Sequence, residues 1–209
     1  MKILCVCNDF YHPGSLVEEG LKFLSDEGYP IDYIVDSSTA SHTVLDQYNT
    51  LILSKANMTA EDKETAWLND DWENAIFLFV KKGGALIVIH SGTAGYENNK
   101  RLKDLMGGSF AEHPEQCLVT YNPVDGYDET TGVEAFSVMD EHYFMNMDNK
   151  NIDLFMTSSS ASGTQPAGWL CRSGAGVVTV LTPGHRIEVW QNPNFKQLLR
   201  NILKKAENA

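Results

Sequence analysis

The sequence predicts an α/β protein of three layers, in which helices cover both faces of a mostly parallel sheet. In the first half of the chain, short apolar runs alternate about four times with segments of helical periodicity. Such alternation implies parallel strands joined by right-handed crossovers. The fourth run, residues 85–90, is almost entirely apolar, as expected of a strand that is buried on both faces. Short strand-like runs in the second half predict extra antiparallel strands.

The first elements have clear local signals. Short apolar runs bounded by polar residues predict three strands, at 2–7, 31–36 and 49–54. Between the first two of them, leucine and valine recur at helical spacing through 15–28, which predicts an amphipathic helix. Gly28 is expected to end that helix.

A second helical segment is expected before the fourth strand. Thr59 and Asp62 resemble a capping box, so the segment is predicted to begin there. It is expected to break near 69–71 and to stop at the double glycine of 83–84.

The second half of the chain lacks this alternation of strands and helices. Short strand-like runs separated by turns occur at 116–122, 134–139, 153–158 and 167–172. We expect them to form an antiparallel part of the sheet. A further buried strand is predicted within 176–185, and the amphipathic segment 192–206 predicts a closing helix.

Length and composition narrow the class of protein. With 209 residues, of which 43% are hydrophobic, the chain is expected to form one domain over 1–209. The formal net charge of −12 repels phosphates, so nucleic acids and anionic membranes are not expected partners. No apolar run approaches the roughly 18–20 residues of a membrane span. The first residues lack a signal-peptide pattern, so a cytoplasmic protein is expected.

Polar side chains follow several predicted strands, where the ligand crevice of an open parallel sheet lies. Asp9 and His12 come after the first strand, and His90 and Ser91 come after the fourth. His185 follows the late strand. Three of the six histidines are therefore expected to meet at one edge of the sheet.

These histidines also have a plain structural interpretation, because an imidazole near a strand end often hydrogen-bonds the backbone. Three histidines follow strands that end at the same edge of the sheet, and this coincidence favours a functional cluster. His113, in the stretch GGSFAEHPEQ, precedes another strand and is expected to fold over the same rim.

A serine nucleophile is one chemistry open to this edge. Ser91 would attack, His185 would act as its base and Glu188 would orient the imidazole, which is the logic of acyl transfer. However, Val88 and Ile89 are bulky, and the serine lacks the G-x-S-x-G surroundings of a nucleophile elbow. The imidazole that precedes this serine suits the roles of base, acid or metal ligand.

Four stretches, taken in order, resemble a known family. They are GGALIVIHSGTAGY (83–96), MGGSFAEHP (106–114), DEHYF (140–144) and PAGWLCRSGAGVVTVLTPGH (166–185). Together they resemble the ThuA-like, or trehalose utilisation, family of the class I glutamine amidotransferase-like superfamily. The resemblance spans nearly the whole chain and implies a flavodoxin-like sheet.

The resemblance also implies a set of site residues. His90 looks like the family's histidine at the place where amidotransferases carry their cysteine. His113, Glu141 and His185 look like the other polar residues that the family brings to the pocket. None of the four cysteines follows the relevant strand turn. A cysteine-dependent glutaminase is therefore not expected, because the thiolate carries that chemistry.

The first functional hypothesis is an enzyme that acts on a small carbohydrate or sugar derivative. Its expected catalytic residues are His90, His113, Glu141 and His185. Its expected substrate contacts are Asp9, His12, Ser91, and the rings of Tyr96 and Trp169, which would stack on a sugar.

A divalent metal such as zinc would suit two or three imidazoles and a carboxylate. The candidate ligands are His90, His113 and His185. Without a metal, a His/Glu pair would abstract and return a proton.

The second hypothesis is a non-catalytic ligand-binding or assembly protein with an amidotransferase-like fold. It predicts a homo-oligomer that binds its ligand unchanged. Trp67, Trp72 and Trp190 are candidates to line a subunit interface, with core packing as the alternative.

Overall fold

Five parallel strands form one half of the main sheet. They are β1 (Ile3–Cys7), β2 (Ile31–Ile34), β3 (Thr50–Ser54), β4 (Ala85–Ile89) and β11 (Gly176–Leu181). The computed structural model describes residues 1–148 and 152–207. The strands lie in the order β2-β1-β3-β4-β11, so the chain first adds strands on one side and then reverses direction. The expected parallel sheet is confirmed.

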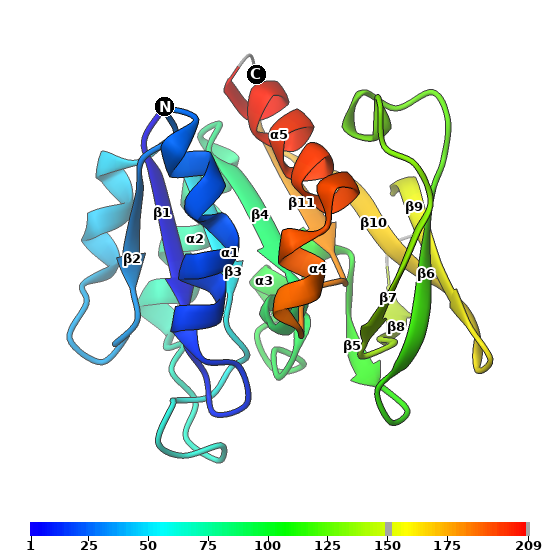
Figure 1. Cartoon of the computed structure of the whole chain (residues 1–209). Coiled ribbons are helices and arrows are strands. Elements are labelled where there is room, and N and C mark those ends of the chain that lie inside the picture. Colours follow the sequence, from blue (N-terminus) through cyan, green and yellow to red (C-terminus); the bar gives the residue numbers. More distant parts are fainter. Residues whose placement is uncertain (149–151, 208–209) are drawn as a thin grey trace.

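Four antiparallel strands extend the same sheet. They are β10 (Gly163–Ser173), β9 (Asp153–Ser160), β6 (Cys117–Pro123) and β7 (Phe136–Asp140). They continue the order beyond β11 as β10-β9-β6-β7 (Figure 1). The antiparallel part expected in the second half is confirmed, and it belongs to the same continuous sheet as the parallel strands.

Helices cover both faces of the parallel half. On one face lie α1 (Gly14–Asp26), α4 (Ile187–Gln191) and α5 (Pro193–Glu207) (Figure 1). On the other lie α2 (Asp70–Lys81) and α3 (Lys100–Met106). A hydrophobic core lies on each face of the sheet. Alternate residues of a strand pack in the two cores, because successive side chains of a strand point to opposite faces. In β1, for example, Cys5 packs in one core and Leu4 and Val6 pack in the other.

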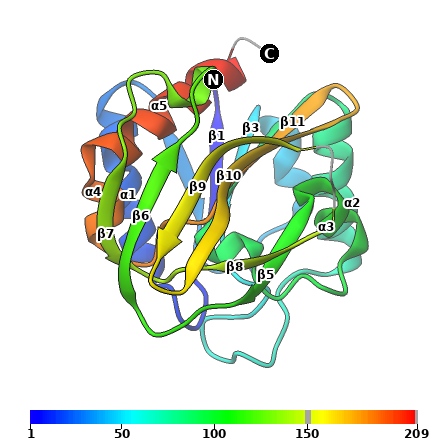
Figure 2. The ribbon, with the colours of Figure 1, turned by 90° about the vertical axis from the view of Figure 1, so that its right-hand side faces the viewer.

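A separate two-stranded antiparallel sheet pairs β5 (Gly108–Glu112) with β8 (Phe144–Met147). Figure 2 shows the two strands side by side near the lower ends of β9 and β10. Neither strand was expected from the sequence. The pair is important for the site, because β5 leads to His113 and β8 follows directly after Tyr143.

The prediction of a helix beginning at Thr59 is wrong. Thr59 Oγ1 does accept the backbone N–H of Asp62 at 3.1 Å, but Asp62 then caps its own turn through Thr65 Oγ1 at 2.7 Å. Helix α2 begins instead at Asp70, where the Asn69 side chain accepts from the N–H of Trp72. Asx and hydroxyl side chains support local turns as readily as helix starts, so the capping pattern was ambiguous.

Short 3₁₀ helices complete the described elements: η1 (His42–Gln47), η2 (His90–Thr93) and η3 (Asp128–Thr130). Among residues 1–148 and 152–207, no helix is both long and apolar enough to cross a bilayer.

Candidate functional site

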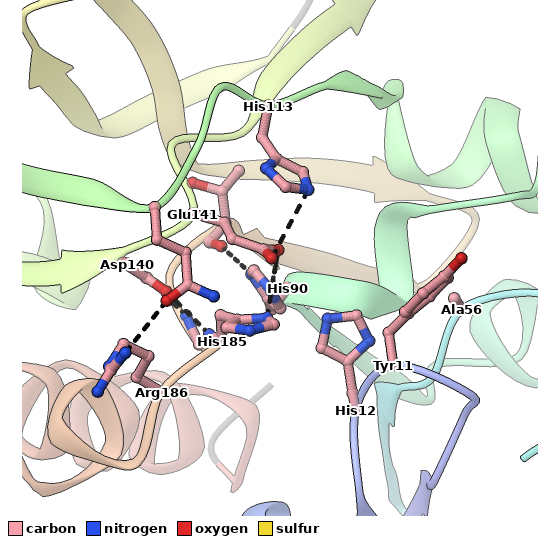
Figure 3. A network of polar contacts seen from close by, with 12 residues as sticks. Tyr11, His12, Ala56, His90, His113, Asp140, Glu141, His185 and Arg186 are labelled. Carbon is pink, nitrogen blue, oxygen red and sulfur yellow. Dashed lines mark hydrogen bonds and ion pairs between the residues drawn. The ribbon is translucent and has the colours of Figure 1, made fainter.

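Three histidines from distant parts of the chain meet at the carboxyl ends of the parallel strands. His12 follows β1, His90 follows β4 and His185 follows β11. Their ring centroids are 5.0 Å apart for His12 and His90, 5.1 Å for His12 and His185, and 5.6 Å for His90 and His185 (Figure 3). The expectation that these imidazoles lie together is therefore met.

Glu141 provides a carboxylate that lies against His90, His185 and a fourth histidine, His113 (Figure 3). Its Oε2 atom is 3.4 Å from His90 Nε2 and 3.2 Å from His185 Nδ1. Its Oε1 atom is 3.6 Å from Nε2 of His113, whose side chain is 34% exposed. His12, His90, His113, His185 and Glu141 are together called the histidine cluster below.

The turn that carries His90 is strained and tightly packed. His90 has φ of 50°, a left-handed conformation that costs a residue other than glycine about 1–3 kcal/mol. A side chain at Gly92 would collide with the backbone carbonyl of Leu53, and one at Gly184 would lie 2.9 Å from His90 Cβ. The turn therefore gets its space from a glycine two residues downstream and from one on a neighbouring loop, without the upstream glycine of a nucleophile elbow.

Asp140 fixes the loop that carries His185. Its buried carboxylate accepts the backbone N–H of His185 at 3.0 Å and that of Gly184 at 3.1 Å. It also accepts the hydroxyl of Tyr121 at 2.7 Å. Because Glu141 is the next residue, the same anchor places its carboxylate against the cluster.

Asp9 fixes His12 in a similar way. One carboxylate oxygen accepts the N–H groups of Tyr11 and His12 at 3.0 and 3.1 Å, and the ring Nδ1 of His12 at 2.7 Å. The other oxygen accepts the N–H of Ala56 at 2.8 Å. Asp9 is only 3% exposed. It therefore positions His12, in place of the substrate contact that the sequence led us to expect.

Burial and close neighbours shift the pKa values of the cluster. Burial alone would raise the pKa of Glu141, but the contacts with His185 and His90 outweigh it and hold that pKa well below its usual range. Burial would lower the pKa of His185, but Glu141 beside it reverses the shift and raises that pKa. Burial lowers the pKa of His12, although Asp9 acts against this. Glu141 is thus ionised, and His12 favours its neutral form.

Two aromatic residues expected to stack on a sugar are instead core residues. Tyr96 and Trp169 are fully buried. The Tyr96 hydroxyl donates to the carbonyl of Lys55 at 2.6 Å, and the Trp169 ring N–H donates to that of Met106 at 2.7 Å. Because both rings pack against apolar neighbours and both polar atoms are satisfied, neither has a face free for a ligand.

The tryptophans considered for a subunit interface are also buried. Trp67, Trp72 and Trp190 are 8%, 3% and 0% exposed. Their core-packing alternative is the one that the structure supports.

The arrangement does not favour a Ser91 nucleophile. Ser91 is buried, and its hydroxyl has no hydrogen-bond partner within the described ranges. Glu188 points away to the surface, where it pairs with Arg186 at 3.4 Å. The carboxylate next to His185 is Glu141, so the expected orienting role of Glu188 is wrong.

Some residues at the site were not singled out from the sequence. Tyr143 is buried and stacks on His90, with ring centroids 4.1 Å apart and an interplanar angle of 25°. Asp140 begins the DEHYF stretch, in which the family resemblance implies a role only for the next residue, Glu141. Phe10 and Tyr11 are 47% and 53% exposed beside His12. Large aromatic side chains in a polar loop were the available signal for this pair.

Four side chains of the histidine cluster could together hold a cation, where the sequence had suggested three ligands. His12, His90, His185 and Glu141 each offer one ligand atom, and these atoms all lie within 4.8 Å of one another. His113, an expected ligand, is outside that group, and His12 and Glu141 join His90 and His185 in it.

A protein-family model matches most of the chain. The model is that of ThuA, described as trehalose utilisation, and it matches residues 11–204. No curated protein sequence matches the chain.

Solved structures share the fold. A ThuA-like protein of Bacteroides uniformis superposes with a TM-score of 0.77 at 17% identity, covering 99% of this chain and 91% of that chain. A ThuA-like protein of Parabacteroides merdae gives 0.79 at 15% identity, covering 99% and 89%. A cytoplasmic protein of Salmonella typhimurium gives 0.72 at 12% identity, covering 99% of each chain. At these identities the likeness establishes the fold alone.

Replacing Asp9 with asparagine tests its role in holding His12. An asparagine side chain has one acceptor oxygen where aspartate has two. Either the donors of Tyr11 and His12 or the backbone N–H of Ala56 therefore lose their acceptor. Asp9→Asn should therefore lower the free energy of unfolding by about 1.5–3 kcal/mol, the range for hydrogen bonds to a charged group. Urea unfolding at pH 7 measures the change. Asp104→Asn, at an exposed position of α3, is the control and should leave the midpoint unchanged.

The same comparison has a defined pH dependence. Burial opposes ionisation of Asp9, but hydrogen bonds from His12 and the backbone hold its pKa below the ordinary 3.8. A lowered folded pKa contributes stability that is fully present above the unfolded value and is lost as the pH falls through the folded one. The difference between wild type and Asp9→Asn should stay constant near neutral pH and shrink below 3.8. Equal stability of the two proteins at pH 7 would contradict this role.

Proposed function

The chain belongs to the ThuA, or trehalose utilisation, family, and from that premise we propose that it is an enzyme acting on a small carbohydrate or sugar derivative. The reaction would take place at the histidine cluster, at the edge of the sheet where open α/β folds bind ligands. The family description names the use of a disaccharide, which supports this substrate class.

One observation carries the proposal: an ionised carboxylate is contacted by imidazoles from three separate segments. Glu141 lies within 3.6 Å of nitrogen atoms of His90, His113 and His185. Burying ionisable groups together costs free energy that packing alone would avoid, so such clusters are typical of functional sites. Imidazoles can exchange protons near neutral pH, which sugar chemistry requires.

His113 is the member best placed to exchange a proton with a substrate. It is the most exposed ring of the cluster, at 34%. Its Nδ1 atom lies 2.7 Å from the carbonyl oxygen of Pro114, which can only accept, so Nδ1 carries a proton and Nε2 is the ring nitrogen available to exchange one. We assign it the role of general base and acid, which removes a proton from the sugar and returns it.

Phe10 and Tyr11 provide the stacking surface that buried Tyr96 and Trp169 do not. Both are about half exposed, and their rings meet edge to face with centroids 5.1 Å apart. The Tyr11 ring centroid is 6.5 Å from that of His12, so a sugar stacked there would reach the cluster. Aromatic faces suit the apolar faces of sugar rings.

The net charge of the chain and the proposed compartment agree with an enzyme that acts on a small molecule. A net charge of −12 supports neither nucleic acid nor an anionic membrane as partner. The Salmonella typhimurium protein with this fold is named as a cytoplasmic protein, and we propose the same compartment for this chain.

A second candidate function is assembly into a homo-oligomer that binds a ligand without changing it. Leu118 and Met139 face each other across β6 and β7 and are 60% and 45% exposed. β7 is the edge strand of the main sheet, and apolar side chains at an open edge favour pairing with another chain. Sedimentation would detect the oligomer, and a converted product would exclude the non-catalytic reading.

Turnover of sugars in D₂O tests the proposed function. Purified protein is incubated with disaccharides, aldoses and keto-sugars, and mass spectrometry follows product formation and deuterium uptake. Wild type should convert or deuterate at least one sugar, because His113 exchanges a proton with it. His113→Ala should slow this by about 10²–10⁴-fold.

His42→Ala, a histidine of η1 outside the cluster, is the control and should retain the wild-type rate. Absence of both product and deuterium over the whole panel would instead favour the binding and assembly function. A His113→Ala protein as fast as wild type would refute the role of His113.

Substitution of Tyr11 tests the stacking surface on whichever sugar is turned over. Tyr11→Ala should raise KM by about two- to tenfold, which corresponds to the ~0.5–1.5 kcal/mol of an aromatic contact. Because Tyr11 is not expected to touch the reacting atoms, kcat should change little. Tyr11→Phe keeps the ring and should restore the wild-type KM. A fall in kcat at constant KM would argue against stacking.

A further inference from the structure

Three ring nitrogens of the histidine cluster lack a hydrogen-bond partner although they are buried. Within the described part of the chain, they are His12 Nε2, His90 Nε2 and His185 Nδ1. The rings of His90 and His185 are close enough to Glu141 to form ion pairs, but neither makes a well-aligned hydrogen bond to it. Buried polar atoms are nearly always satisfied, so three unsatisfied nitrogens in one place require an explanation.

The partners of the other ring nitrogens determine two of the tautomers. His90 Nδ1 is 2.8 Å from the carbonyl of Thr182, and His12 Nδ1 is 2.7 Å from the carboxylate of Asp9. Both partners can only accept, so each Nδ1 carries a proton. In the neutral imidazole, Nε2 then has a free lone pair directed into the cluster.

The interior of the cluster is therefore rich in acceptors. Among the described residues of the site, it holds inward lone pairs on His12 and His90 and the carboxylate oxygens of Glu141, against one unpartnered ring nitrogen of His185 that could donate. Acceptors that face one another repel, and a buried cation between them relieves this repulsion. A metal ion satisfies all of these lone pairs at once.

We infer that His12, His90, His185 and Glu141 bind a divalent transition metal ion, with zinc as the ion that this donor set fits best. Their ligand atoms lie within 4.8 Å of one another. Ligands of a tetrahedral zinc ion are roughly 3.3 Å apart, given bonds of about 2.0–2.1 Å, so small side-chain movements would close the site. Three nitrogens and one carboxylate suit zinc or its neighbours rather than calcium or magnesium.

The contacts behind the ligands support this assignment. Histidine ligands usually donate their second ring N–H to a carboxylate or a carbonyl, which fixes the tautomer and the ring direction. His12 does so to Asp9 and His90 does so to Thr182. A proton-relay cluster would not need both rings locked with their lone pairs inward.

The inference deepens the proposed function and rests on its site. The metal would supply a Lewis acid that polarises a sugar oxygen. His113 stays outside the ligand group and remains free to exchange protons, so the two assignments are compatible.

Zinc titration of the whole protein tests the inference without any substrate. Protein freed of metal by dialysis against a chelator is titrated with ZnCl₂ in a calorimeter, and elemental analysis counts the bound ion. Wild type should bind one equivalent. His12→Gln and Glu141→Gln should each weaken binding by about 100-fold or more, since loss of a supporting contact alone costs 10–100-fold.

His113→Ala is the matched control, because His113 also contacts Glu141 but lies outside the ligand group. It should bind zinc within about threefold of wild type, and circular dichroism verifies that every variant is folded. Failure of folded wild type to bind zinc, or equal loss in His113→Ala and His12→Gln, would overturn the inference. Zinc binding without sugar turnover refutes only the proposed function, whereas turnover by metal-free protein refutes only the Lewis-acid role of the metal.

Discussion

The site depends on the buried carboxylate of Asp140, which joins two parts of the sheet. Asp140 ends β7, in the antiparallel part, and accepts the backbone N–H groups of Gly184 and His185, beyond the parallel strand β11. These two hydrogen bonds hold the loop that carries His185 against the segment that carries Glu141. The antiparallel extension thus contributes the carboxylate, while the parallel strands lead to the imidazoles of His12, His90 and His185.

The second constraint is that the rings are held in one orientation before any ligand arrives. Asp9 and the carbonyl of Thr182 fix the tautomers of His12 and His90, and Tyr143 stacks on His90. Such preorganisation means that little conformational freedom is lost when a cation or substrate binds. The strained φ of His90 fits the same picture, since strain is kept where the surroundings enforce it.

The sequence alone predicted the parts of this account that follow from the sheet. Alternating strands and helices predict the parallel half, and residues that follow its strands must share one edge, which is why His12, His90 and His185 were expected to meet. His113 was expected at the same rim from its place before a strand, but Glu141 came from the family resemblance, because a topological rule cannot place the loops of an antiparallel extension. Tyr96 and Trp169 were misassigned, since the sequence does not show which aromatic rings are buried. The prediction that Glu188 orients His185 was wrong, because spacing along the chain does not give the direction of a side chain.

Anomalous diffraction from crystals of the zinc-loaded protein tests the central claim most directly. The account predicts one strong zinc peak at about 2.0–2.2 Å from Nε2 of His12, Nε2 of His90, a ring nitrogen of His185 and an oxygen of Glu141. A zinc peak only at other residues would contradict it. So would a cluster that stays metal-free in zinc while His90 Nε2 donates a hydrogen bond to Glu141.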